Sequence, residues 1–282
     1  MLRASPAIQG YQIPGLSHRV LISLFADDTA LYLSEHDRYH DVKAILDQWC
    51  TALGACFNIH KTEVTATRKL HPDDPTPLPT GITIAPDHHA IRYLGAWIGN
   101  NLDDDAPWET TLDKIRNTLN AWLSAYPTLA GKRHVIQMVV GSMTQYLTTV
   151  QGMPTTILHA VTKEIQHFLW PDRHSAAIDP KYLYRSPDHG SLGLLDVKAR
   201  NEAIELMWLK SYLDLSTSRP AWAFVADTLI NRLTPPHVTD LTVMNTFLQT
   251  WTPPLQGARA NTLPPSLLRM LQAAKKYHIW SK

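Results

Sequence analysis

Residues 20–33 read Val-Leu-Ile-Ser-Leu-Phe-Ala-Asp-Asp-Thr-Ala-Leu-Tyr-Leu. The two outer runs, 20–24 and 29–33, are apolar and rich in residues that favour β-strands, and Asp27-Asp28 lies between them. Two short β-prone runs on either side of a polar pair are typical of an antiparallel hairpin. We therefore predict a hairpin that carries two adjacent carboxylates at its tip.

The residues around this hairpin complete a small α+β region. Met1 to Ala4 resembles the end of a helix, and Ala7 to Ile13 reads as an incoming strand. Apolar residues recur at three- and four-residue spacing between Asp37 and Phe57, which predicts an amphipathic helix. The segment 71–80 contains four prolines and predicts a loop. Further strand-like runs lie at 63–67, 81–85 and 91–98.

The second half of the chain has a helical period. Apolar stripes joined by short connections predict a helical bundle, and they run over 108–126, 135–150 and 157–169. Asp196 is the predicted N-cap of a helix that ends at Tyr212, and the prolines after Arg219 predict only short helical pieces. The predicted fold class is α+β, with a small antiparallel sheet and helix over 1–104, an all-α bundle over 105–172 and a loosely organised helical region over 173–282.

Composition excludes several classes of protein. The chain has 282 residues, of which 44% are hydrophobic and 18% charged, so it is neither disordered nor fibrous. Its formal net charge of +1 gives no general attraction for nucleic acid, so any such binding must come from local sites. Two cysteines and the lack of a signal peptide favour an intracellular protein, and no apolar run is long enough to predict a membrane span.

The adjacent acids at 27 and 28 are the residues that most clearly indicate chemistry. Nucleotidyl transfer uses two divalent ions about 3.5–4 Å apart, held by carboxylates, to activate a hydroxyl and stabilise the leaving pyrophosphate. Mg²⁺ prefers oxygen ligands and keeps several waters, which suits an exposed turn. The alternative is structural, because Asp is common in turns whatever the protein does.

Three motifs in order favour the catalytic interpretation. Residues 24–33 resemble the catalytic hairpin of the reverse transcriptases of LINE-type (non-LTR) retrotransposons. Cys56-Phe57-Asn58-Ile59-His60-Lys61-Thr62-Glu63-Val64 is similar to the next palm motif of that family, and residues 93–99, Tyr-Leu-Gly-Ala-Trp-Ile-Gly, resemble its primer-gripping hairpin. The resemblance covers about residues 5–215 and includes two stretches of the connector after the thumb, 168–170 and 190–194.

The resemblance implies roles for individual residues. Asp27 would be the principal metal ligand and Asp28 its weaker neighbour, holding Mg²⁺ or Mn²⁺. Lys61 would donate a proton to pyrophosphate, where a cation also offsets the charge of the leaving group. For Lys61 the alternative is a solvated lysine that follows a helix.

The resemblance also implies contacts with an RNA template and a DNA primer. Tyr93, Leu94 and Gly95 would support the primer backbone, the glycine allowing close approach, although an ordinary strand turn explains them as well. Lys132 and Arg133, at the start of the second bundle helix, would meet phosphates of the duplex, although a solvated helix start is the alternative. Fold, partners and a nuclear location follow from the same resemblance, with 1–104 as an incomplete palm and 105–172 as the thumb.

One part of the expected site has no counterpart. The family's third carboxylate comes from a strand many tens of residues before the Asp-Asp hairpin, and only 26 residues precede Asp27. We therefore expect a fragment that is inactive alone and that an N-terminal palm and fingers segment would complete. The C-terminal zinc knuckle of the family also has no counterpart in this sequence, because Cys50 and Cys56 both fall in the palm. The alternatives are a non-catalytic nucleic-acid-binding or protein-interaction module, and a pseudogene product that does not fold alone.

Overall fold

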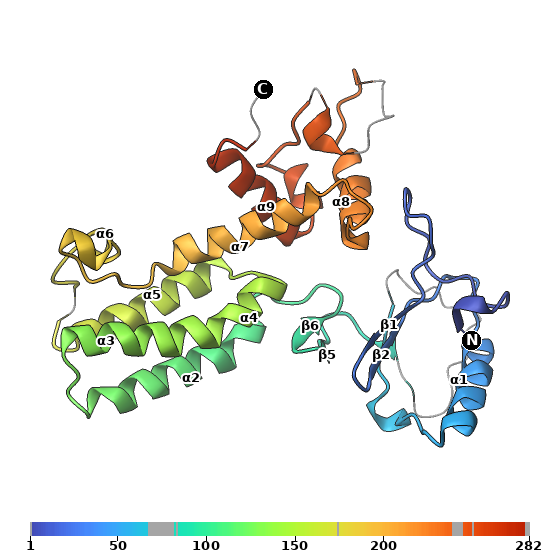
Figure 1. Ribbon diagram of the computed structural model, residues 1–282, viewed down its shortest axis with the longest axis horizontal. Helices are drawn as coiled ribbons and strands as arrows, with labels where there is room; N and C mark the ends of the chain where they lie inside the picture. Colours follow the sequence, from blue (N-terminus) through green and yellow to red (C-terminus); the bar gives the residue numbers. More distant parts are fainter. Residues whose placement is uncertain are drawn as a thin grey trace. The chain divides into compact units, whose positions relative to one another are not determined.

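The computed structural model describes residues 2–66, 82, 84–173, 175–238, 245–249 and 251–279 (Figure 1). The fold class is α+β, as predicted, with short strands and a larger share of helix. The chain divides into two compact units. Unit 1 comprises 1–94, 98–101 and 211–263, and unit 2 comprises 95–97, 102–210 and 264–282.

The N-terminal part of unit 1 contains the predicted hairpin. Strand β1 (Ile22–Phe25) pairs antiparallel with β2 (Asp28–Leu31), and Phe25 faces Asp28 in the register. Helix α1 (Tyr39–Leu53) packs on it through a small core, and Gly54 ends the helix in the left-handed conformation with φ 66°. The buried residues of this core are Leu2, Ile8, Leu21 and Val42.

The segment before the hairpin differs from the prediction. Leu2–Ala4 forms a single 3₁₀ turn, η1, and Ala7 to Ile13 contributes only an isolated bridge between Tyr11 and Val20. Side chains, rather than a neighbouring strand, form the hydrogen bonds to the backbone of this segment. Arg19 donates to the carbonyls of Arg3, Ser5 and Ile8.

Asp37 forms hydrogen bonds with backbone N–H groups of the same region. Its buried carboxylate accepts hydrogen bonds from the backbone of Gln9, Gly10 and Ser34 at 2.5, 2.8 and 2.8 Å. Burial alone would raise the pKa of Asp37, but these N–H groups hold it below its ordinary value. The predicted start of the helix at Asp37 was therefore wrong, because this side chain is committed to the N-terminal segment and α1 begins at Tyr39.

The remaining strands do not join the hairpin in one antiparallel sheet. β3 (Val64–Thr65) pairs in parallel with β4 (Ile84–Ala85), and β5 (Ile91–Tyr93) pairs with β6 (Ala96–Ile98) as a separate sheet. The prediction of a single antiparallel sheet was wrong, because strands of two or three residues offer too few backbone groups to extend a sheet. The predicted loop at 71–80 lies outside the described residues.

Unit 2 contains the predicted bundle. Helix α2 covers Ala106–Leu123, and α5 covers Thr155–Leu169. Between them, α3 (Leu129–Ile136), a π-helical turn η3 (Gln137–Gly141) and α4 (Ser142–Gln151) form one continuous helix. All three predicted helices are confirmed. Their core is closed around fully buried side chains, among them Trp108, Ile115, Ile136, Val140, Val161 and Phe168.

The prolines after residue 219 do not break every element, which corrects the prediction for this region. Pro220 precedes α8 (Ala221–Asn231), and Pro264 and Pro265 begin α9 (Pro265–Lys276). Proline is tolerated at a helix start, where its missing N–H would have no partner. The shorter elements are α6 (Pro180–Leu183), η4 (Pro187–His189), η5 (Thr246–Leu248) and η6 (Ala260–Thr262).

Helix α7 (Val197–Tyr212) begins as predicted, since the Asp196 carboxylate accepts from the N–H of Ala199 at 3.0 Å. In unit 1, Asp227 is fully buried and binds both the Tyr212 hydroxyl at 2.6 Å and the Arg219 guanidinium at 2.7 Å. Burial, followed by the contact with Asp227, raises the pKa of Tyr212.

Candidate functional site

The turn of the β1–β2 hairpin places both acids at its tip. Ala26 has φ 51°, a left-handed conformation that residues with a side chain rarely adopt, and the chain reverses there. Asp27 and Asp28 are both exposed. Neither carboxylate has an ion pair with any residue that the structure describes. The pair is therefore accessible and not neutralised by the described part of the chain.

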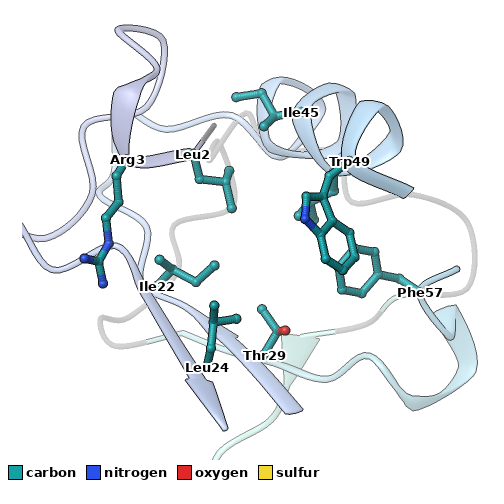
Figure 2. A pocket seen from close by; sticks show the side chains of 9 residues that line it. Leu2, Arg3, Ile22, Leu24, Thr29, Ile45, Trp49 and Phe57 are labelled. Atoms are coloured by element: carbon teal, nitrogen blue, oxygen red, sulfur yellow. The ribbon is translucent and has the colours of Figure 1, made fainter. Parts of the chain in front are cut away.

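An apolar groove begins next to this tip. It has a volume of about 460 Å³ and lies between the hairpin and α1 (Figure 2). Ile22, Leu24 and Thr29 line it from the hairpin, and Ile45 and Trp49 line it from the helix. The rest of the lining comes from Leu2, Arg3, Leu46 and Phe57. The Trp49 and Phe57 rings lie 5.7 Å apart between centroids and form one wall.

The hairpin beside this groove is open in two ways. Leu24 and Phe25 are 66% and 64% exposed, which is unusual for neighbouring large apolar residues in a strand. Each strand of the two-stranded sheet also has one edge that no other described strand covers. Unpaired strand edges attract a further strand, because their N–H and C=O groups lack partners in the sheet.

The donor set at the tip fits a divalent cation only in part. Two carboxylates are ligands that Mg²⁺ accepts, with water filling the other positions. Within the described ranges, no three His, Cys, Asp or Glu side chains come together as a metal site. Asp27 and Asp28 thus supply two oxygen ligands of the right chemistry, and a two-ion centre needs more.

The second motif forms a tight turn that ends at Lys61. η2 (Ile59–Lys61) is capped by Asn58, whose side chain accepts from the N–H of His60 at 3.1 Å. The Thr62 hydroxyl donates to the Asn58 carbonyl at 3.0 Å. Lys61 is exposed. The Asn and Thr of this motif therefore have a structural task, which leaves the lysine side chain projecting from a fixed turn.

The third motif is the turn between β5 and β6. Leu94 and Gly95 have φ values of 48° and 80°, and two successive positive φ values are the signature of a tight hairpin turn. Tyr93 precedes this turn, and its hydroxyl is buried without a partner in the described part of the chain. Burial raises the pKa of Tyr32, and Tyr93 raises it further, so the end of the Asp-Asp hairpin and the third motif are neighbours in unit 1.

Helix α4 fixes the strand that leaves this turn. The Gln151 amide accepts from the Trp97 N–H and donates to the Trp97 carbonyl, both at 3.1 Å. The positive φ of Gly95 favours glycine there, and a Cβ would lie 3.0 Å from the Tyr146 ring, so this ring would have to shift. The roles of Gln151 and Tyr146 were not predicted, because residues about fifty positions apart give no periodic signal.

Lys132 and Arg133 are half-buried and engaged with the backbone of unit 2. The Lys132 ammonium donates to the Leu169 carbonyl at 3.0 Å, at the end of α5. The Arg133 guanidinium donates to the Gly193 carbonyl at 3.2 Å, in the glycine-containing stretch after the bundle. These contacts join α3 to later segments, which explains both residues without a phosphate. Asp27, Asp28 and Lys61 belong to unit 1, whereas Lys132 and Arg133 belong to unit 2.

Comparison with known proteins adds no relative. No protein-family model matches the chain, and no curated protein matches it. Among the helices of the described residues, none has both the length and the apolar character needed to cross a membrane.

Proposed function

We propose that this chain is the C-terminal part of an RNA-directed DNA polymerase of the LINE type, inactive alone. One observation carries the proposal, namely two exposed carboxylates that no described residue pairs with, at the tip of a hairpin with an apolar groove beside it and edges that no described strand covers. A turn that held two acids only for local structure would not need that open face beside it.

We also infer from the open groove which kind of partner would complete the site. A further strand beside the hairpin would cover Leu24 and Phe25 and would satisfy one free edge. If that strand carried a carboxylate, it would add the ligand that Asp27 and Asp28 lack. We assign this role to an N-terminal palm and fingers segment that completes the site.

Each site residue has a defined task in the completed enzyme. Asp27 and Asp28 would hold Mg²⁺, or Mn²⁺, which supplies activation of the primer 3′-hydroxyl and neutralises the leaving group. Lys61 would donate a proton to pyrophosphate, and the turn at Tyr93, Leu94 and Gly95 would support the primer that is paired to an RNA template. Because such an enzyme acts on chromosomal DNA, the proposal includes a nuclear location.

A second candidate is a non-catalytic nucleic-acid-binding or protein-interaction module. The core of the bundle favours it, because the helices of unit 2 bury a large set of apolar side chains among themselves. The two candidates differ in whether Asp27 and Asp28 bind a metal ion.

Metal binding tests the proposal directly. Mn²⁺ added to the chain should broaden the NMR signals of residues near the hairpin tip, because a paramagnetic ion relaxes nearby nuclei. The broadening should disappear in Asp27→Asn combined with Asp28→Asn. It should persist in Asp104→Asn, a matched change at an exposed acid of unit 2. Equal broadening in all three proteins would remove the metal-binding role.

Primer extension on an RNA template tests the inactive state. With Mg²⁺ or Mn²⁺ the chain alone should incorporate no nucleotide, because a two-ion centre with one ligand missing holds its ions weakly. Incorporation that Asp27→Asn abolishes would support the polymerase and contradict the claim that it needs a further segment.

A further inference from the structure

One end of the bundle in unit 2 carries an open pocket that lies outside the hairpin site of unit 1. It has a volume of about 580 Å³. Its lining residues come from the end of α2, the start of α3 and the end of α5, with the segments next to them. Figure 1 shows these helix ends at one end of the bundle. All its lining residues belong to unit 2, and they are Leu123, Tyr126, Pro127, Lys132, Leu169, Trp170, Pro171, Asp172 and Arg173. Its volume falls in the range of ligand pockets, and its lining combines aromatic with charged side chains.

The aromatic side of the pocket is Tyr126. This residue is 91% exposed and has φ 47°, so the backbone adopts an uncommon conformation while the ring is presented to solvent. Trp170 contributes a second aromatic side chain, and its indole N–H is buried without an acceptor in the described ranges. A buried donor of this kind is normally satisfied by protein, water or a ligand.

The charged side of the pocket is cationic. Lys132 uses one of its three N–H groups on the Leu169 carbonyl, so two remain for an anion. Arg173 is exposed, and its guanidinium has no ion pair or hydrogen bond among the described residues. Asp172 is the acid in the lining, so two cations face one carboxylate.

We propose that this pocket binds an unpaired nucleotide of a single-stranded nucleic acid, with the base on Tyr126 and the phosphate between Lys132 and Arg173. Stacking on an exposed aromatic ring next to cations that hold the backbone is how single strands are bound without sequence preference. A duplex does not suit the site, because its base faces are already stacked. A phosphorylated peptide would use the cations and leave the aromatic ring without a role.

This inference is independent of the metal chemistry at Asp27 and Asp28. It depends on Tyr126, Lys132 and Arg173, three side chains of unit 2, and it holds whether or not the chain belongs to a polymerase. It also gives Lys132 a second task beyond its contact with Leu169, while Arg133, which donates to Gly193, lies outside the lining.

Binding of a fluorescein-labelled 12-nucleotide single strand to the full chain at low salt is the test. Tyr126→Ala and Arg173→Glu should each weaken binding by about tenfold or more, because base stacking and phosphate contacts each contribute on this scale. Tyr126→Phe should retain binding, since the ring face remains. Both positions are exposed, so the variants should unfold at the temperature of the unchanged protein.

Matched controls separate a local contact from a general effect of charge or of a lost ring. Lys114→Glu, on α2 and outside the pocket, changes the net charge by the same amount as Arg173→Glu. Tyr182→Ala removes another exposed tyrosine of unit 2. Both controls should bind the strand as tightly as the unchanged chain, and so should Asp27→Asn, which tests the polymerase proposal separately.

Three outcomes would overturn the proposal. The first is equal affinity in Tyr126→Ala, Arg173→Glu and their controls. The second is tighter binding of a 12-base-pair duplex than of the single strand. The third is binding of adenosine monophosphate without any binding of the strand, which would assign the pocket to free nucleotides.

Discussion

The hairpin of unit 1 and the bundle of unit 2 treat their large apolar residues in opposite ways. In the bundle, Trp108 is 1% exposed and Val161 is completely buried, whereas Leu24 and Phe25 on the hairpin are about two-thirds exposed. Burial of such side chains contributes roughly 1.5–3 kcal/mol each, so Trp108 and Val161 stabilise the fold in a way that Leu24 and Phe25 do not. The difference shows that the bundle covers these large side chains, whereas the end of the hairpin leaves its own in contact with solvent.

The largest effect should come from the bundle core. Trp108→Ala should lower the free energy of unfolding by about 3–5 kcal/mol, because it leaves a large cavity among side chains that cannot fill it. Trp49→Ala, in the groove wall, should cost about 1 kcal/mol or less, because Trp49 is 40% exposed. Urea unfolding of both variants measures the contrast. Equal losses would mean that the two units do not differ in this way.

The next effect concerns the buried polar cluster of unit 1. Asp227→Ala should cost about 3 kcal/mol, because it leaves the buried Arg219 guanidinium and the Tyr212 hydroxyl without their partner. Asp47→Ala, at an exposed acid of the same unit, is the matched control and should change little. Thermal unfolding gives the comparison, and a wild-type melting temperature in Asp227→Ala would contradict it.

A pH-dependent effect follows from Asp37. Its pKa is lowered in the folded chain, so the ionised carboxylate stabilises the N-terminal segment above the ordinary pKa of Asp near 4. This stability should be lost as the pH falls through 4 and below. Asp37→Asn should show less of that loss and should be less stable at pH 7 by about 2 kcal/mol, since the carboxylate accepts three backbone hydrogen bonds. Urea unfolding from pH 3 to pH 7 measures both; parallel curves for the two proteins would count against the role of Asp37.

The smallest effect on stability should come from the open hairpin. Phe25→Ser should change the free energy of unfolding by less than about 0.5 kcal/mol, because the ring is already in water. The same change should reduce self-association, measured by sedimentation, because an exposed apolar patch beside a free strand edge promotes it. A large loss of stability would show that the ring packs against something in the folded chain.

The sequence predicted those elements whose signal lies in neighbouring residues. The bundle helices followed from apolar stripes, the hairpin from residues 20–33, and the start of α7 from Asp196. The parallel pairing of Val64 with Ile84 was missed, since a pairing of such short strands is decided by the rest of the fold. Helix α9 was missed because prolines at 264 and 265 were interpreted as breaks rather than as a helix start.

The candidate site divides in the same way. Neighbouring residues were enough to predict the place of Asp27 and Asp28 at a hairpin tip and the turn at Leu94 and Gly95. A turn is determined by only a few consecutive residues. The groove could not be predicted in this way, because it is formed by Leu2, the hairpin and α1 together. The hydrogen bond from Lys132 to the carbonyl at the end of α5 could not be predicted either, since its acceptor lies 37 positions away.

The π-helical turn at residues 137–141 fixes the rotational phase of the second bundle helix. Each residue of an α-helix advances the side-chain direction by about 100°, so a wider turn resets the face that every later position presents. Both halves contribute buried side chains to the bundle core, and the half after the turn also reaches Trp97 through Gln151. Removing one residue from this turn would leave a continuous helix with regular hydrogen bonds. It would nevertheless rotate Gln151 away from the strand that it holds.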